Sequence, residues 1–106
     1  MTARDRIHAS DHSLDRCLDR FEVAGRKRQR AFIRQALSEG VWLNGEQALA
    51  AGLTRQPPEK ANWYCVSMTA VLVVSPDRCV LTCWRTPKAW SRPQTWRRLV
   101  GVRGCP

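Results

Sequence analysis

The first half of the chain carries apolar residues at helical spacing. In the first stretch they recur every three or four residues, at Leu14, Cys17, Leu18 and Phe21. This period predicts an amphipathic helix that Ser10 or Asp11 can cap and that ends near Gly25. A second helix is predicted from about Lys27 to Glu39, with Gly40 as its end. Its inward positions are Phe32, Ile33, Ala36 and Leu37.

The second half of the chain has the pattern of β-strands. Three runs rich in β-branched and aromatic residues span 63–67, 69–75 and 79–84. A tight turn at 76–78 joins the last two runs, which should therefore pair antiparallel. Before them, the sequence indicates a short extended piece at 41–43, a turn at Asn44-Gly45, and one or two helical turns at 46–51. The order predicts an α+β fold, in which two N-terminal helices pack on a three- to four-stranded antiparallel sheet.

Length and composition fit a single domain. The chain has 106 residues, and 43% of them are hydrophobic, which is enough for one core. We expect a flexible N-terminus at 1–9, one α+β domain at 10–85 and a basic, Trp- and Arg-rich C-terminal tail at 86–106. No apolar run reaches membrane-span length, and no apolar segment follows the N-terminal charges. We therefore expect a cytoplasmic protein with no membrane partner.

The cysteines and carboxylates do not predict a metal site. The five cysteines are an odd number, and without an export signal a disulfide framework is not expected. Cys79 and Cys83 form one loosely spaced pair, with His8 and His12 as the available histidines, whereas structural zinc sites usually combine two close pairs. The acidic residues are too dispersed for a two-metal nuclease, and the glycines do not form a phosphate-binding loop. We therefore expect no metal and no other cofactor.

The chain is strongly basic, and its cations are concentrated in two regions. Lys and Arg number 18 against 9 for Asp and Glu, a net charge of +9. The excess falls on the outer face of the second helix and in the C-terminal part, where tryptophans are interleaved with the cations. Cations suit phosphates and indoles suit unpaired bases, so we expect nucleic-acid contacts there. The candidates are Arg26, Lys27, Arg28, Arg30, Arg34, Trp84, Arg85, Lys88, Arg97 and Arg98. The alternative is that the cations are only solvated and the indoles cover the sheet.

One edge of the first predicted helix combines groups that can act on a phosphodiester. At about 100° per residue, Arg16 and Arg20 lie about 40° and 80° from His12, almost opposite the apolar residues. RNA cleavage needs a group that titrates near neutrality and fixed cations for the charge on phosphorus. The alternative is a solvated polar face, in which Asp15 and Asp19 form weak ion pairs with the arginines.

Short motifs between Ile7 and Arg85 resemble a known group of proteins. In order they are His12-x-x-x-Arg16-x-x-x-Arg20, a second helix, a glycine-containing connection, a Trp-led strand, and Val71-Leu-Val-Val-Ser-Pro-Asp-Arg-Cys-Val-Leu-Thr-Cys-Trp84. This order is similar to that of small bacterial and phage-borne toxin-like domains of the barnase–EndoU–colicin–RelE superfamily of metal-independent ribonucleases. The resemblance implies a His- and Arg-bearing helix packed against a curved antiparallel sheet. A Val-x-Thr-x-aromatic strand then faces the cleft, with Thr82 and Trp84 on one face.

The resemblance also implies a role for each matched residue. His12 would act as general acid/base, and Arg16 with Arg20 would hold the phosphate. Thr82 would hydrogen-bond the scissile phosphate or the ribose 2′-hydroxyl, and Trp84 would stack on a base. In the alternative, Thr82 is an ordinary strand residue and Trp84 a core indole.

Two features of the chain depart from this resemblance. The basic tail after Arg85 has no counterpart in the pattern. His8 is a second imidazole close to His12, and if His8 were the matching residue the arginine spacing would no longer fit. Whether His8 or His12 is the relevant histidine therefore stays open.

These observations lead to a functional hypothesis with two alternatives. The first is a metal-independent RNA-cleaving protein, toxin-like or phage accessory, with RNA as substrate and an acidic neutralising partner (an antitoxin or immunity protein) or a host protein. The second is a non-enzymatic phage or mobile-element protein that binds nucleic acid, or inhibits a host nucleic-acid machine, through its basic face. The third is an inhibitor that uses exposed tryptophans as anchors at a protein interface.

Overall fold

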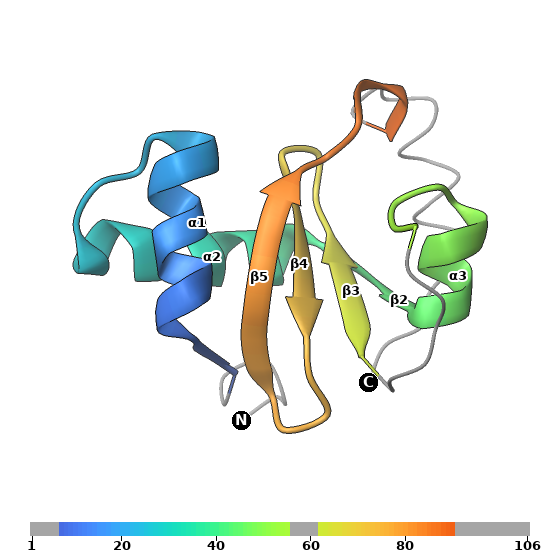
Figure 1. Cartoon of the computed structure of the whole chain (residues 1–106), viewed down its shortest axis with the longest axis horizontal. Helices are drawn as coiled ribbons and strands as arrows, with labels where there is room; N and C mark the ends of the chain where they lie inside the picture. Colours follow the sequence, from blue (N-terminus) through green and yellow to red (C-terminus); the bar gives the residue numbers. More distant parts are fainter. Residues whose placement is uncertain (1–6, 56–61, 91–106) are drawn as a thin grey trace.

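The computed structural model describes residues 7–55 and 62–90 (Figure 1). Its first helix, α1 (Asp11–Phe21), follows Ser10, whose side-chain oxygen accepts a hydrogen bond from the Ser13 N–H at 3.1 Å. Glu22 ends the helix in the left-handed conformation (φ 58°), and its N–H donates to backbone carbonyls of the last turn. The first helix is thus capped by the predicted serine and ends before Gly25.

Helix α2 (Arg26–Glu39) follows the predicted range closely. Its buried residues are Gln29, Ile33, Ala36 and Leu37. Gln29 can be buried because its amide donates to the Val23 carbonyl at 2.9 Å and its side-chain oxygen accepts from Arg26. The two helices meet at Phe21 and Phe32, whose ring centroids lie 4.7 Å apart.

The predicted inward position of Leu18 is wrong, since its side chain is 50% exposed. Leu14 and Cys17, in contrast, are fully buried. Helix α1 packs mainly against one strand, so only the centre of its apolar stripe is covered, and Leu18 lies at the margin of that stripe.

The sheet has five strands rather than the predicted three or four. The first is β1 (His8–Ala9), and the others are β2 (Val41–Asn44), β3 (Trp63–Val66), β4 (Ala70–Val74) and β5 (Cys79–Arg85). Their order is β1-β5-β4-β3-β2, and β1 runs parallel to β5 whereas all other pairs are antiparallel. The prediction of a purely antiparallel sheet is therefore wrong. Because β1 has two residues and no apolar alternation, the sequence pattern does not reveal it.

The helical turns predicted at 46–51 form a third helix, which starts at the Asn44-Gly45 pair that was predicted as a turn. Asn44 caps α3 (Gly45–Ala50) by accepting from the Gln47 N–H at 2.8 Å, and the Gln47 side chain accepts from the Asn44 N–H at 2.9 Å. This reciprocal capping explains why Asn44-Gly45 starts a helix instead of a hairpin. A short 3-10 helix, Lys88–Trp90, follows β5. Within residues 7–55 and 62–90, none of the helices combines the length and apolarity that a membrane span requires.

The sheet has an apolar cluster on each face. One cluster joins α1 and α2 to the sheet through residues such as Leu14, Cys17, Ile33, Leu72, Val80 and Cys83. The other lies on the α3 side and includes Leu43, Ala48, Tyr64, Val71 and Val73, with Trp84 and Trp90 packed against it. Figure 1 shows α1 beside β5, α2 passing behind the strands and α3 at the other end of the sheet. The structure is thus an α+β fold whose N-terminal helices pack on the sheet.

Candidate functional site

Helix α1 is attached to the outer edge of β5 near both of its ends. At the start of the helix, the Ser10 N–H donates to the Val80 carbonyl at 3.1 Å, and the Ser10 hydroxyl donates to the Leu81 carbonyl at 3.3 Å. Near its end, Arg20 donates from Nη1 to the Cys83 carbonyl at 2.7 Å. These bonds fix the position of the helix along the strand, and we call this contact the α1–β5 seam.

A β-bulge in β5 decides which of its side chains face α1. Val74 pairs with Val80 and Val73 pairs with Thr82, so Leu81 is an extra residue in the strand. Val80 therefore joins the core cluster under α1, whereas Thr82 turns to the opposite face. Without the extra residue, Val80 and Thr82 would share a face.

Thr82 and Trp84 share the α3-side face, as the spacing of two residues predicts. Their partners across the ladder are Val73 and Val71, both members of the α3-side cluster. The indole of Trp84 packs edge-on against Tyr64, with ring centroids 6.4 Å apart. Trp84 is half-buried, so it is fixed by packing and still has an accessible surface.

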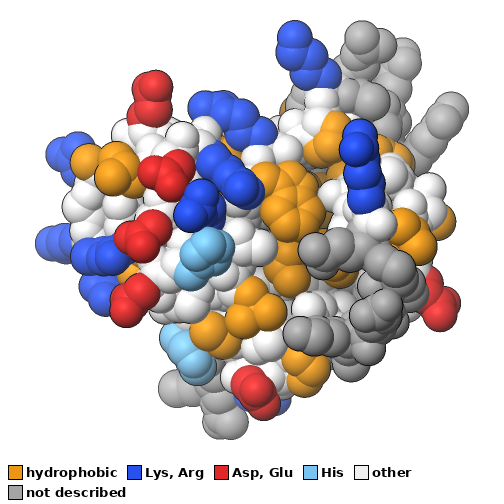
Figure 2. Space-filling model, in the orientation of Figure 1, with side chains coloured by type: hydrophobic (Ala, Val, Ile, Leu, Met, Phe, Trp, Pro, Cys, Tyr) orange, Lys and Arg blue, Asp and Glu red, His pale blue; other side chains and the backbone are white. Residues whose placement is uncertain are grey.

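The candidate row His12, Arg16 and Arg20 lies on the side of α1 that borders β5. Ser13, about 100° around the helix from His12, is fully buried, and its backbone carbonyl accepts a hydrogen bond from the Cys83 thiol at 3.8 Å. The side of α1 that carries Ser13 therefore faces β5, and the row of His12, Arg16 and Arg20 lies beside that side. Figure 2 shows histidine and Lys or Arg side chains gathered over α1, next to apolar side chains over β5.

The seam also brings His12 and Thr82 to the same end of α1. His12 is two residues after Ser10, and Thr82 directly follows Leu81, the residue whose carbonyl Ser10 binds. The imidazole is exposed, and the threonine is partly exposed. The structure thus places an imidazole and two guanidinium groups on α1 beside β5, and the Thr82 hydroxyl on the same strand, on the α3-side face of the sheet.

The two arginines of the row have different surroundings. Arg16 donates to Asp19 at 3.2 Å, while its Nε is buried without a hydrogen-bond partner among the described residues. Arg20 uses one nitrogen for the Cys83 carbonyl and has its other N–H groups left for a ligand. Beneath them, a hydrogen bond with Cys17 and burial raise the pKa of the Cys83 thiol, although Arg20 and Arg16 oppose this. Cys83 therefore stays protonated and is a buried residue beneath the two arginines.

The other predicted nucleic-acid contacts are divided between different surfaces. Arg85 lies at the far end of the seam, its guanidinium carbon 5.3 Å from the centroid of the Phe21 ring. Lys88 is exposed beyond β5. Arg97 and Arg98 lie outside the described residues. The basic tail therefore remains a prediction from residue 91 onward.

The cations of α2 do not extend the row on α1. Asp11, Asp15 and Asp19 lie about 20–100° from His12 on the side of α1 away from β5, and all three are exposed. Asp15 binds Arg26 of α2 at 2.9 Å, whereas Asp19 binds Arg16 of the row at 3.2 Å. Figure 2 shows red side chains between the row beside β5 and further blue side chains at the outer end of the molecule. The row beside β5 and the cations of α2 are therefore two separate surfaces.

Sequence reasoning missed two residues that shape the seam. Ser10 was recognised only as a helix cap, and its hydrogen bond to Leu81 joins residues far apart in sequence. Tyr64 gave no signal as the partner of Trp84, because the register between β3, β4 and β5 determines that contact.

The seam can bind and polarise a phosphodiester with its own side chains. Its cations supply fixed charge, His12 supplies an imidazole, and Thr82 supplies a hydroxyl. In the described parts of the chain, no three His, Cys, Asp or Glu side chains are grouped so as to hold a metal ion. Comparisons of the chain with protein-family models, curated proteins and solved structures find no match.

Proposed function

We propose that the protein is an endoribonuclease that cleaves unpaired RNA with its own side chains, as its resemblance to the toxin-like ribonuclease domains implies. The observation that carries this proposal is the α1–β5 seam. Ser10 and Arg20 attach α1 to β5 so that the His12 row borders the strand of Thr82 and Trp84.

The proposed reaction is attack of the ribose 2′-oxygen on the adjacent phosphorus. His12 takes the proton of the 2′-hydroxyl, the bond from phosphorus to the 5′-oxygen breaks, and the leaving oxygen receives a proton from solvent. The products are a 2′,3′-cyclic phosphate and a 5′-hydroxyl. Arg16 and Arg20 stabilise the charge that develops on the phosphate oxygens.

The remaining residues of the seam position the substrate in this proposal. Thr82 hydrogen-bonds the scissile phosphate or the 2′-hydroxyl. Trp84 stacks on a base, which requires that the base be unpaired. Arg85, at the end of the seam, binds a neighbouring phosphate. The cytoplasm, where RNA is abundant, is the proposed compartment, and an acidic protein is the kind of partner that could cover these cations.

A second candidate is a nucleic-acid or host-protein binder without turnover. The Arg16–Asp19 ion pair favours it, since a carboxylate already occupies one of the proposed phosphate ligands. This reading predicts steeply salt-dependent binding that His12→Ala does not affect.

The test is cleavage of a fluorescent single-stranded RNA by the purified protein, with analysis of the product ends. We expect 2′,3′-cyclic phosphate ends, full activity in EDTA, and no cleavage of the same strand when every ribose is 2′-deoxy. Intact RNA, products with 3′-hydroxyl ends, or equal cleavage of the deoxy strand would contradict the proposal.

A further inference from the structure

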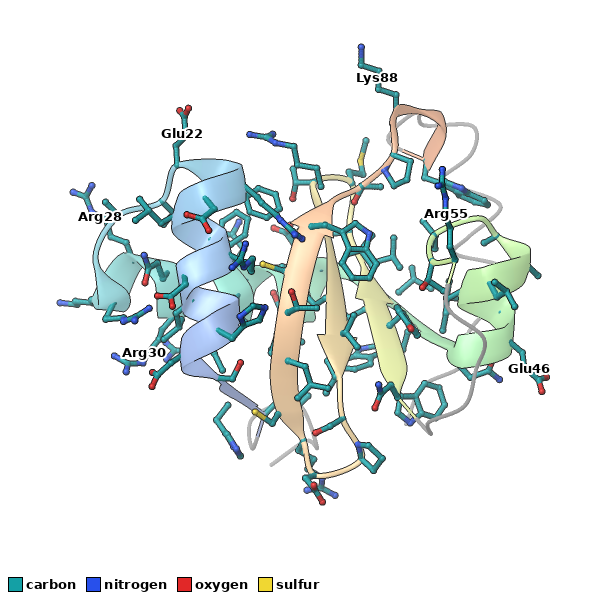
Figure 3. All side chains as sticks on the ribbon, in the orientation of Figure 1. Glu22, Arg28, Arg30, Glu46, Arg55 and Lys88 are labelled. Atoms are coloured by element: carbon teal, nitrogen blue, oxygen red, sulfur yellow. The ribbon has the colours of Figure 1, made fainter. Side chains whose placement is uncertain are left out.

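Helix α2 presents a row of cations to solvent. Lys27, Arg30 and Arg34 are spaced by three and four residues, which places them on one face, and all three are exposed. Among the described residues, none of them takes part in an ion pair or a side-chain hydrogen bond. We call these three residues the α2 ridge. Figure 3 shows Arg30 pointing away from the sheet.

The position of these cations does not help the helix to form. The N-cap, Gly25, provides no side-chain hydrogen bond, and the first turn contains cations and no acid. The positive end of the helix dipole is where a basic side chain is least favourable. Lys27 therefore opposes the helix dipole, and Arg30 and Arg34 form no ion pair that would stabilise α2 among the described residues, so a role in binding accounts for the ridge better.

The ridge is separate from the α1–β5 seam. The carboxylates of Asp11, Asp15 and Asp19 lie between the two sets of cations, and Arg26 is held by Asp15. A single strand of RNA could not run from the seam across α1 to the ridge without passing these carboxylates. The ridge must therefore bind a different part of the RNA or a different molecule.

The composition of the ridge favours a phosphate backbone over a protein. Protein interfaces are built around buried aromatic or aliphatic anchors, whereas the exposed residues beside the ridge are Ala31, Gln35 and Ser38. The ridge also has no exposed aromatic ring on which unpaired bases could stack. Helical rise separates its cations by about 4.5 and 6 Å along the axis, so a regular array of phosphates can meet them.

We propose that the α2 ridge binds the sugar–phosphate backbone of double-helical RNA, independently of sequence. The choice of RNA rests on the proposed function, in which the seam acts on an unpaired segment. The ridge would then hold a folded region of the same RNA while the seam holds the segment that is cut.

The experiment measures binding of a blunt RNA duplex of about 20 base pairs over about 50–200 mM KCl. The test variant is Arg30→Gln/Arg34→Gln, since glutamine keeps helix propensity. The control is Arg55→Gln/Arg78→Gln, which removes the same charge from exposed positions beside α3 and in the β4–β5 turn. Figure 3 shows Arg55 at the opposite end of the molecule from Arg30.

We expect the ridge variant to bind about tenfold more weakly and the slope of log K against log salt to fall by about two, while the control keeps the wild-type slope. Equal losses in both variants, or equal binding of all three proteins, would overturn the inference. So would a ridge variant that loses binding only to an acidic peptide, or only to a DNA duplex of the same sequence.

Ridge-dependent duplex binding without RNA cleavage would support the role of the ridge and refute the proposed function. RNA cleavage together with duplex binding that does not depend on the ridge would support the proposed function and refute the role of the ridge.

Discussion

Ser10 connects two parts of the molecule that are 71 residues apart in sequence. Its side chain caps α1 by accepting from Ser13 and also donates to the Leu81 carbonyl. One hydroxyl can do both, because it has a donor and two acceptor lone pairs. The local role is readable from the sequence, while the distant role determines where His12 lies relative to β5.

Substitutions at Ser10 can separate these two roles. Ser10→Thr keeps both, whereas Ser10→Asp keeps the cap but has no proton to donate to Leu81. We expect the aspartate variant to retain most of the wild-type stability but to cleave RNA with a lower kcat and an almost unchanged KM. Ser10→Ala should lose about 1 kcal/mol in the free energy of unfolding as well. An aspartate variant as active as the threonine variant would contradict the role of the seam.

Arg20 should not be replaceable by lysine. Its guanidinium donates to the Cys83 carbonyl and still has N–H groups for a phosphate, whereas one ammonium cannot match this forked geometry. We expect Arg20→Lys to reduce kcat/KM for RNA cleavage by about 10- to 100-fold. The matched control is Arg78→Lys, in the β4–β5 turn, which should cleave like the wild type. Equal rates for both variants would remove Arg20 from the site.

At the scale of elements, the junction between α2 and β2 allows little space. A Cβ at Gly40 would lie 2.9 Å from the Ala36 carbonyl oxygen and would overlap the Cys65 sulfur. Gly40 has an extended backbone (φ −77°), so contact rather than backbone conformation requires glycine here. The close approach lets β2 start directly after the helix.

Gly40→Ala should therefore destabilise the protein by about 1–3 kcal/mol in denaturant unfolding. Combining it with Cys65→Ala removes one of the two overlapping atoms. The double variant should consequently be less destabilised than the sum of the two single variants. Strict additivity would show that Gly40 and Cys65 do not meet as described.

The sequence pattern predicts the elements that bury a regular apolar face. Helices α1 and α2 follow from apolar residues at helical spacing, and strands β3, β4 and β5 follow from runs of β-branched and aromatic residues. Strand β1 depends on backbone pairing with a distant strand, and α3 depends on a reciprocal cap at Asn44 that also reads as a turn. The sequence therefore does not reveal β1, and for α3 it predicts helical turns at 46–51 but not the cap at Asn44 that starts the helix.

The candidate site likewise combines features that the sequence predicts with features that it does not. Helical geometry places His12, Arg16 and Arg20 on one edge, and strand geometry places Thr82 and Trp84 on one face. The extra residue Leu81 and the bond to Ser10, which join these two sets, arise only from tertiary register. Sequence reasoning could therefore supply the residues of the site but not the seam that brings them together.

At the scale of the whole molecule, the net charge of +9 is not spread evenly. A row of carboxylates on α1 separates the cations of the seam beside β5 from the ridge on α2. Two separate basic surfaces can contact two different segments of one RNA. A single continuous patch would bind both segments in the same way. We propose chemistry for the seam and anchoring for the ridge.

The central claim is that an imidazole on α1, next to β5, moves the proton in RNA cleavage. The most direct measurement compares single-turnover cleavage of one single-stranded RNA by the wild type, His12→Ala and His8→Ala, with folding of each checked by circular dichroism. We predict that His12→Ala loses about 10²–10⁴-fold in rate while His8→Ala, on β1, stays close to the wild type. A folded His12→Ala protein that cleaves at the wild-type rate would contradict the account.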